Sequence, residues 1–211
     1  MKLIANATSC NAYPKRTGAS CPPPSGVRTV LRSFKDVVQH YIKRYRARAN
    51  HELSFFRRIN SLDEAIEKAA NAEGQDGKKY DHQWRIPAPT LDRAAKALLT
   101  VAAQISNCTS FESLIELVEA TAGRIEGFGE LAIYDATLRI GARLGVEPKY
   151  VYLHRGTRKG AKALGLASHR KYLEVTELPG EFARLKPREI EDCLCIYARE
   201  LSRLKRAIDP V

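Results

Sequence analysis

Apolar residues recur at steps of three and four along most of the chain, which is the period of an α-helix buried on one side. The most regular run starts at Val27 and ends at Tyr45, with Ser25 in the position of an N-cap. Alternation of apolar and polar residues, the pattern of a half-buried β-strand, is confined to the short segment 171–175. The pattern predicts an all-α fold, a single compact helical domain of about seven helices around one core.

Capping residues and helix breakers mark where the predicted helices begin and end. Ser61 and Thr109 are each followed three residues later by a glutamate, which is the capping-box pattern. Thr90 is the expected N-cap of another apolar run. Gly145 is the expected end of the helix that follows the two glycines at 127 and 129. Pro187 suits the first position of a long terminal helix.

The N-terminal segment 1–25 differs from the rest of the chain in composition. It is rich in Ser, Pro, Gly and Asn, and residues 22–24 are three consecutive prolines. Proline lacks the amide hydrogen that helices and central strands require. We therefore expect a flexible, disordered tail over 1–25 and a helical domain over 26–211.

The segment 81–89 holds the only tryptophan, Trp84, and two prolines that exclude a continuous helix. An extended segment with Trp84 anchored in the core is the first interpretation. Stacking of a nucleic-acid base on Trp84, beside His82 and Arg85, is the alternative.

The charge balance is strongly basic, with 35 Lys and Arg against 24 Asp and Glu and a net charge of +11. An excess of this size favours a polyanionic partner, and nucleic acid above an acidic protein or a membrane surface. A basic protein without such a partner is the alternative. No run approaches the 18 or so apolar residues of a transmembrane helix, so no membrane association is expected.

Five cysteines occur, an odd number, and none forms a C-x-x-C pair. Cys193 and Cys195 are two residues apart in a helical pattern and so point to different faces. Neither a disulfide framework nor a zinc site is supported, and the five histidines are scattered. We expect no metal, no cofactor and a reducing, cytoplasmic location.

Two glycines flank Phe128 between two apolar helical patterns, over 114–144. A tight turn with Gly127 and Gly129 that leads into a helix directs free backbone amides outward, and the helix start adds partial positive charge. Such a turn binds a phosphate without reading sequence, and the ring of Phe128 would fill the gap between the helices. A helix C-cap followed by a turn without any ligand is the alternative.

Basic residues cluster after this hairpin. The segment 149–171 holds seven basic residues and no acid, and Thr157 is the expected cap of a second glycine-bearing helix start. The segment 28–58 holds nine basic residues and two acids, which indicates either a phosphate-tracking face or an ordinary solvated one. The predicted nucleic-acid-binding residues are Gly127, Phe128, Gly129, Lys149, Arg155, Arg158, Lys159 and Lys162.

The segment from Ile125 to Gly129, with apolar residues on both sides, resembles the helix-hairpin-helix motif of DNA-repair proteins, including the DNA glycosylases. This local resemblance covers roughly thirty residues and implies DNA binding through phosphates. Glycosylases of this superfamily often carry a lysine two residues past the second glycine, where this chain has Leu131. Their catalytic aspartate falls in the segment that here reads 151–154 and contains no acid.

Asp135 and His154 are the titratable residues near the hairpin that we nominate as candidate catalytic groups. The function expected is that of a DNA-binding helix-hairpin-helix protein. Glycosylase-like processing of a DNA base is a further function that the resemblance leaves open. The alternatives are a non-enzymatic nucleic-acid-binding module and a helical protein-interaction module with an acidic partner. Double-stranded DNA held through phosphate contacts is the expected partner. The sequence leaves catalysis, the target base, DNA versus RNA and the oligomeric state open.

Overall fold

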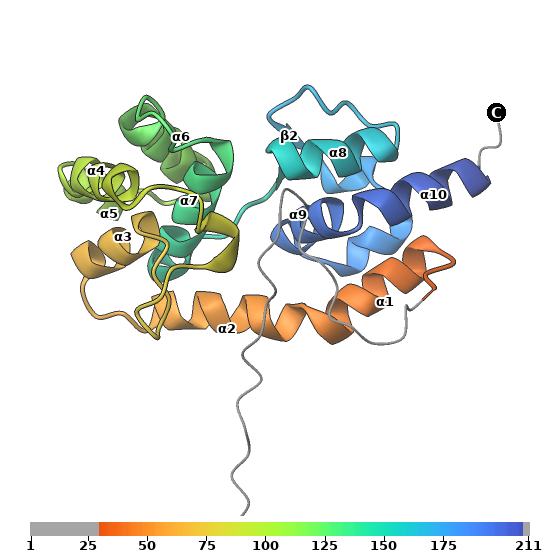
Figure 1. Cartoon of the computed structure of the whole chain (residues 1–211), viewed down its shortest axis with the longest axis horizontal. Helices are drawn as coiled ribbons and strands as arrows, with labels where there is room; N and C mark the ends of the chain where they lie inside the picture. Colours follow the sequence, from red (N-terminus) through yellow and green to blue (C-terminus); the bar gives the residue numbers. More distant parts are fainter. Residues whose placement is uncertain (1–29, 209–211) are drawn as a thin grey trace, which may run out of the picture.

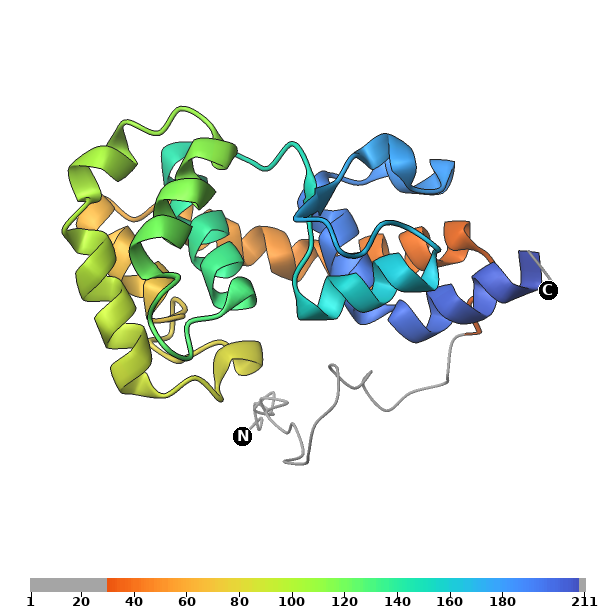
Figure 2. The ribbon, with the colours of Figure 1, turned by 90° about the horizontal axis from the view of Figure 1, so that it is seen from above.

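The computed structural model describes residues 30–208, which form two helical lobes side by side (Figures 1 and 2). Over this range the all-α expectation is confirmed, although the helices number ten rather than about seven. Two of the expected helices are each broken once, into α4 and α5 and into α9 and α10, and α2 follows the run that was expected to end at Tyr45. The helices are α1 Phe34–Arg44, α2 Arg46–Arg57, α3 Leu62–Ala70, α4 Ala88–Leu99, α5 Ala102–Ser106, α6 Phe111–Ala122, α7 Glu130–Leu144, α8 Arg155–Ala163, α9 Pro187–Ile196 and α10 Ala198–Ile208.

Little strand is present in the described part of the chain. The strands β1, Val151–Tyr152, and β2, Tyr172–Leu173, pair antiparallel, with Val151 opposite Leu173. Three 3₁₀ turns complete the secondary structure: η1 Asp81–Gln83, η2 Val175–Glu177 and η3 Gly180–Arg184.

The buried apolar side chains form two clusters rather than the single core that we expected. The first cluster joins α2 to α7 and includes Phe56, Phe111 and Ile140, and we call α2–α7 the first lobe. The second joins α1 to α8, α9 and α10, and we call α1 with residues 151–208 the second lobe. A helical period shows which face is buried but not which helix covers it, so the division could not be read from the pattern.

A helix pair, α1 and α2, passes along both lobes (Figure 1). The expected helix over 27–45 begins at Phe34, capped by the side chain of Ser33, and ends at Arg44, and a second helix starts directly after Tyr45. The expected cap Ser25 and the tail 1–25 lie outside the described residues. Because α1 packs in the second lobe and α2 in the first, the pair ties the two lobes together.

Local capping signals were right in part. The side chain of Ser61 caps α3 as expected, Gly145 ends α7 in the left-handed conformation, and Pro187 opens α9. The cap of α6 is Ser110 rather than Thr109, and α4 begins before Thr90, whose side chain points to another segment. Neighbouring residues of similar capping ability differ by too little free energy for a sequence pattern to separate them.

Within residues 30–208, none of the helices combines the length and the apolar character needed to cross a lipid bilayer.

Candidate nucleic-acid interface and interlobe site

The loop 123–129 joins α6 to α7 and has the geometry of a glycine-dependent hairpin. Gly127 has a φ of +86°, a conformation that L side chains rarely adopt. Phe128 is buried, and its amide donates to the carbonyl of Ile125 at 2.9 Å. Phe128 therefore packs in the apolar cluster of the first lobe, and its placement in the gap between the two helices stays a prediction.

Gly129 forms the N-cap of α7 with extended backbone, φ −85° and ψ −176°. It carries no side chain to cap the first turn, and no described heavy atom would lie within 4 Å of a Cβ added there. The start of α7 therefore offers amide donors and partial positive charge beside open space.

Thr90 supports the hairpin from α4. Its hydroxyl donates to the carbonyl of Glu126 at 3.4 Å, and its methyl group would lie 3.4 Å from a Cβ on Gly127. Gly127 therefore serves the turn and its packing, while Gly129 faces the side on which a ligand has room.

The basic helix α8 lies beside the start of α7. The guanidinium of Arg158 is 3.0 Å from the carboxylate of Glu130, the first residue of α7. The same guanidinium donates to the carbonyls of Ser168 and Arg170, at 2.9 and 2.7 Å. Arg158 is thus a structural link as well as a surface charge, which the sequence did not indicate.

The other predicted phosphate ligands are distributed unevenly around this contact. Arg155, Lys159 and Lys162 are exposed residues of α8. Lys149 is also exposed but precedes β1, where its amide donates to Glu112 of α6. The structure therefore brings the hairpin and α8 together and places Lys149 on a separate segment.

The second basic segment, 28–58, is partly engaged inside the fold. Arg46 makes a two-pronged ion pair with Glu189, at 2.8 and 2.9 Å, and Arg57 pairs with Glu147 at 3.2 Å. A continuous phosphate-tracking face on this segment is disfavoured because these guanidinium groups hold one part of the molecule against another.

Asp135 and His154, the two nominated catalytic residues, have different partners on opposite sides of the lobe junction. Asp135 on α7 contacts Nε2 of His82 at 2.9 Å. His154 caps α8 and contacts Glu191 of α9 at 2.5 Å. Thr157, the expected cap of α8, instead accepts a hydrogen bond from the amide of His154. Among the described residues no hydrogen bond joins the nominated pair, but the charge of each shifts the pKa of the other.

Burial and charge act in opposite directions on the pKa values of the Asp135–His82 pair. For His82, desolvation lowers the pKa, but the charge and hydrogen bond of Asp135 outweigh it and the pKa is raised. For Asp135, burial raises the pKa, but His82, Arg139 and His154 together bring it below its usual range. Both groups are thereby stabilised in their charged forms.

A buried arginine positions His82. Arg139 is 1% exposed, and its guanidinium contacts Glu52 at 2.9 Å and the side-chain oxygen of Gln83 at 2.8 Å. The guanidinium also lies over the ring of Tyr80, 4.3 Å from its centre. These contacts hold the segment around η1 against α7, which places His82 next to Asp135.

A second group of buried acids lies in α9. Burial raises the pKa of Glu191 although His154 opposes the shift, and burial together with the Glu191 charge raises that of Asp192 to about 8. The hydroxyl of Tyr41 donates to Asp192 at 2.6 Å. Burial also lowers the pKa of His154, but Glu191 outweighs it and the pKa is raised.

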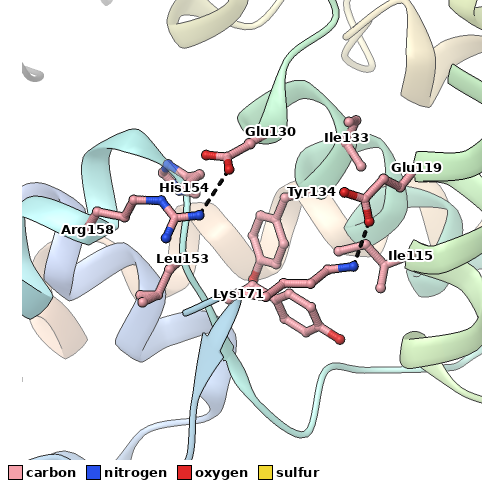
Figure 3. A pocket seen from close by; sticks show the side chains of 10 residues that line it. Ile115, Glu119, Glu130, Ile133, Tyr134, Leu153, His154, Arg158 and Lys171 are labelled. Carbon is pink, nitrogen blue, oxygen red and sulfur yellow. Dashed lines mark hydrogen bonds and ion pairs between the residues drawn. The ribbon is translucent and has the colours of Figure 1, made fainter. Parts of the chain in front are cut away.

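A small pocket of about 50 Å³ opens between the lobes and is lined by residues of α6, α7, α8 and β1 (Figure 3). Among the described residues, the buried hydroxyl of Tyr134 in this pocket has no hydrogen-bond partner. A buried polar atom without a partner is rare and costly. The volume suits a few water molecules rather than a ligand of the usual size.

Trp84 follows η1 and is 66% exposed, so the expectation that it anchors the core is wrong. The guanidinium of Arg85 lies 5.1 Å from its ring centre. An aromatic residue in a segment without helical periodicity gives no signal of which side it faces, and base stacking on Trp84 stays a prediction.

Sequence reasoning did not assign roles to His82, Tyr134, Glu191 or Asp192. His82 lies 53 positions from its partner and Glu191 lies 37 positions from His154, so no local spacing marks either pair. Within residues 30–208, no group of three or more His, Cys, Asp or Glu side chains is arranged to hold a metal ion.

Comparisons with known protein families, with characterised proteins and with solved structures found no match to this chain.

Proposed function

We propose that this protein binds double-stranded DNA through its phosphate backbone, with α6, the loop 123–129 and α7 acting as a helix-hairpin-helix element. The observation that carries the proposal is the open, side-chain-free N-cap at Gly129 with the basic helix α8 beside it. Backbone amides at a helix start and nearby cations are the groups that bind phosphate without reading sequence.

The net charge of +11 supports the same partner, because DNA attracts a basic protein over long distances. Lys159 and Lys162 are the cations best suited to test it, since both are exposed on α8. Arg158 is a poorer choice, because reversing its charge would also break its hydrogen bonds to the carbonyls of Ser168 and Arg170 within the second lobe.

The test is binding of a labelled random-sequence duplex, followed by fluorescence anisotropy at several salt concentrations. We expect the logarithm of affinity to fall linearly with the logarithm of salt, by roughly 0.9 per neutralised phosphate. Lys159→Glu and Lys162→Glu should each weaken binding to all sequences alike, because phosphate contacts carry no sequence information.

Lys96→Glu provides the matched control, since this exposed lysine of α4 pairs with Asp92 of its own helix. Equal losses in all three variants would show that only net charge matters. Salt-independent binding, or none, would favour an acidic protein partner.

The second candidate function is processing of a DNA base, and the Asp135–His82 pair favours it. The imidazole of His82 is 38% exposed while the carboxylate of Asp135 is 14% exposed. A carboxylate that orients a solvent-accessible imidazole is an arrangement used to activate water. Trp84, exposed two residues beyond His82, offers a face on which a base could stack.

Incubation with damaged, modified and plain duplexes, scored for abasic sites, tests this second candidate. His82→Gln and Asp135→Asn should both abolish base release while phosphate-dependent binding persists. Absence of base release by the wild-type protein on every substrate would leave a DNA-binding protein without this activity.

A further inference from the structure

Two exposed ion pairs join the lobes on either side of the Tyr134 pocket, as Figure 3 shows. Arg158 pairs with Glu130 at 3.0 Å, and Lys171 pairs with Glu119 at 2.6 Å. Both cations belong to the second lobe, and both carboxylates belong to the helices that flank the hairpin in the first lobe.

These pairs neutralise two cations that line the pocket beside the start of α7. Glu130 occupies the first turn of α7, where a phosphate would also gain from the helix start. A carboxylate and a phosphate present similar oxygens to a guanidinium or an ammonium group. Each glutamate thus takes the place that a phosphate oxygen would take.

We propose that Glu119 and Glu130 act as internal substitutes for DNA phosphates and are displaced when DNA binds. This inference rests on the proposed function and adds a phosphodiester subsite at Arg158 and Lys171. The exchange is inexpensive, because exposed ion pairs contribute only about 0.2–1 kcal/mol. The side chains of Glu119 and Glu130 are 50% and 59% exposed, so both carboxylates can turn into water.

Displacement of the two glutamates also breaks these two interlobe ion pairs at the mouth of the pocket. The lobes remain joined through α2, where Arg46 pairs with Glu189 and Asn50 accepts a hydrogen bond from Arg188. The mouth of the pocket therefore opens while α2 holds the lobes together. The hydroxyl of Tyr134, which is buried without a partner among the described residues while the two ion pairs are intact, then gains access to water or to a bound group.

The decisive measurement is duplex affinity for Glu119→Gln, Lys171→Gln and the double variant. Glu119→Gln frees Lys171 and should raise affinity roughly 1.4- to 5-fold, the range that corresponds to breaking one exposed ion pair. The gain should vanish when Lys171 is also Gln, because the released cation is then absent.

Glu116→Gln is the matched control, since Glu116 is exposed one turn earlier on the same helix and its loss changes the net charge equally. An equal gain in duplex affinity in Glu116→Gln, or a gain that persists when Lys171 is Gln, would overturn the proposal that a phosphate displaces Glu119. Failure of the wild-type protein to bind duplex at all would instead remove the proposed function.

Hydrogen exchange of residues 151–154 tests the opening, because a bound phosphate would itself protect the amides that begin α7. We expect faster exchange in the DNA complex than in the free protein, and faster exchange in free Glu119→Gln than in free Glu116→Gln. Slower exchange throughout residues 151–154 on DNA binding would contradict opening.

Discussion

The carboxylate of Asp135 lies 2.9 Å from Nε2 of His82, a residue 53 positions earlier in the chain. Asp135 projects from α7, and His82 belongs to η1, which Arg139 holds against the same helix through Gln83. The pair therefore depends on one buried guanidinium and on the packing of the first lobe. It gives the protein a partly exposed imidazole with a fixed carboxylate partner.

Asp135→Asn should lower the pKa of His82, because the variant keeps a hydrogen-bonding group but loses the charge that raises this pKa. An NMR titration of the histidine ring signals measures the change. An unaltered His82 pKa in the variant would show that another group controls it.

The same pair should make stability depend on pH. The folded pKa of His82 is raised above 6.5, so its contribution is complete below pH 6.5 and is lost as pH rises through the folded value. The folded pKa of Asp135 is lowered below 3.8, so its contribution is complete above pH 3.8 and is lost on acidification. Thermal melting should show the wild-type advantage over Asp135→Asn to be greatest between these two values.

Asp192→Asn should increase stability at alkaline pH. The folded pKa of Asp192 is raised from 3.8 to about 8, so its contribution to wild-type stability decreases as pH rises between these values. Asparagine has no proton to lose and retains an oxygen that accepts from Tyr41. We expect the melting temperature of the variant to exceed that of the wild type at pH 8.5, with a smaller difference at pH 5. Parallel curves at all pH values would argue against the raised pKa.

Gly129→Ala and Gly127→Ala should separate DNA binding from folding. Gly129 has negative φ and open space beside it, so alanine should preserve the helical circular dichroism while its methyl group meets the phosphate. We expect duplex binding to weaken by roughly 1–3 kcal/mol, the scale of a lost charge-assisted contact.

Gly127 has φ +86°, so alanine there should cost about 1 kcal/mol of stability or more. If folded Gly129→Ala binds duplex DNA with undiminished affinity, the hairpin only caps the helix and does not bind phosphate.

Tyr134→Phe should leave stability unchanged or increase it. The hydroxyl is buried without a partner among the described residues, and removing an unsatisfied polar group removes its desolvation cost. Chemical denaturation compares the two proteins, with Tyr41→Phe as the control because its hydroxyl donates to Asp192. If Tyr134→Phe loses as much free energy of unfolding as Tyr41→Phe, the hydroxyl of Tyr134 must have a hydrogen-bond partner.

Local signals were sufficient for much of the helical architecture. The apolar period of α7, its end at Gly145 and the capping of α3 by Ser61 all depend on residues within a few positions of one another. The burial of Phe128 was also predictable, because two glycines around an aromatic ring leave few other arrangements. In each case, short-range backbone geometry and helix periodicity fix the outcome.

Only the tertiary structure decided where those helices pack and which polar groups meet. The division of α1 and α2 between two lobes follows from contacts between distant helices, which no local period encodes. Trp84 faces solvent for the same reason, because its burial depends on segments remote in sequence. The pairing of Asp135 with His82 arises from packing across the first lobe, so only the folded chain reveals it.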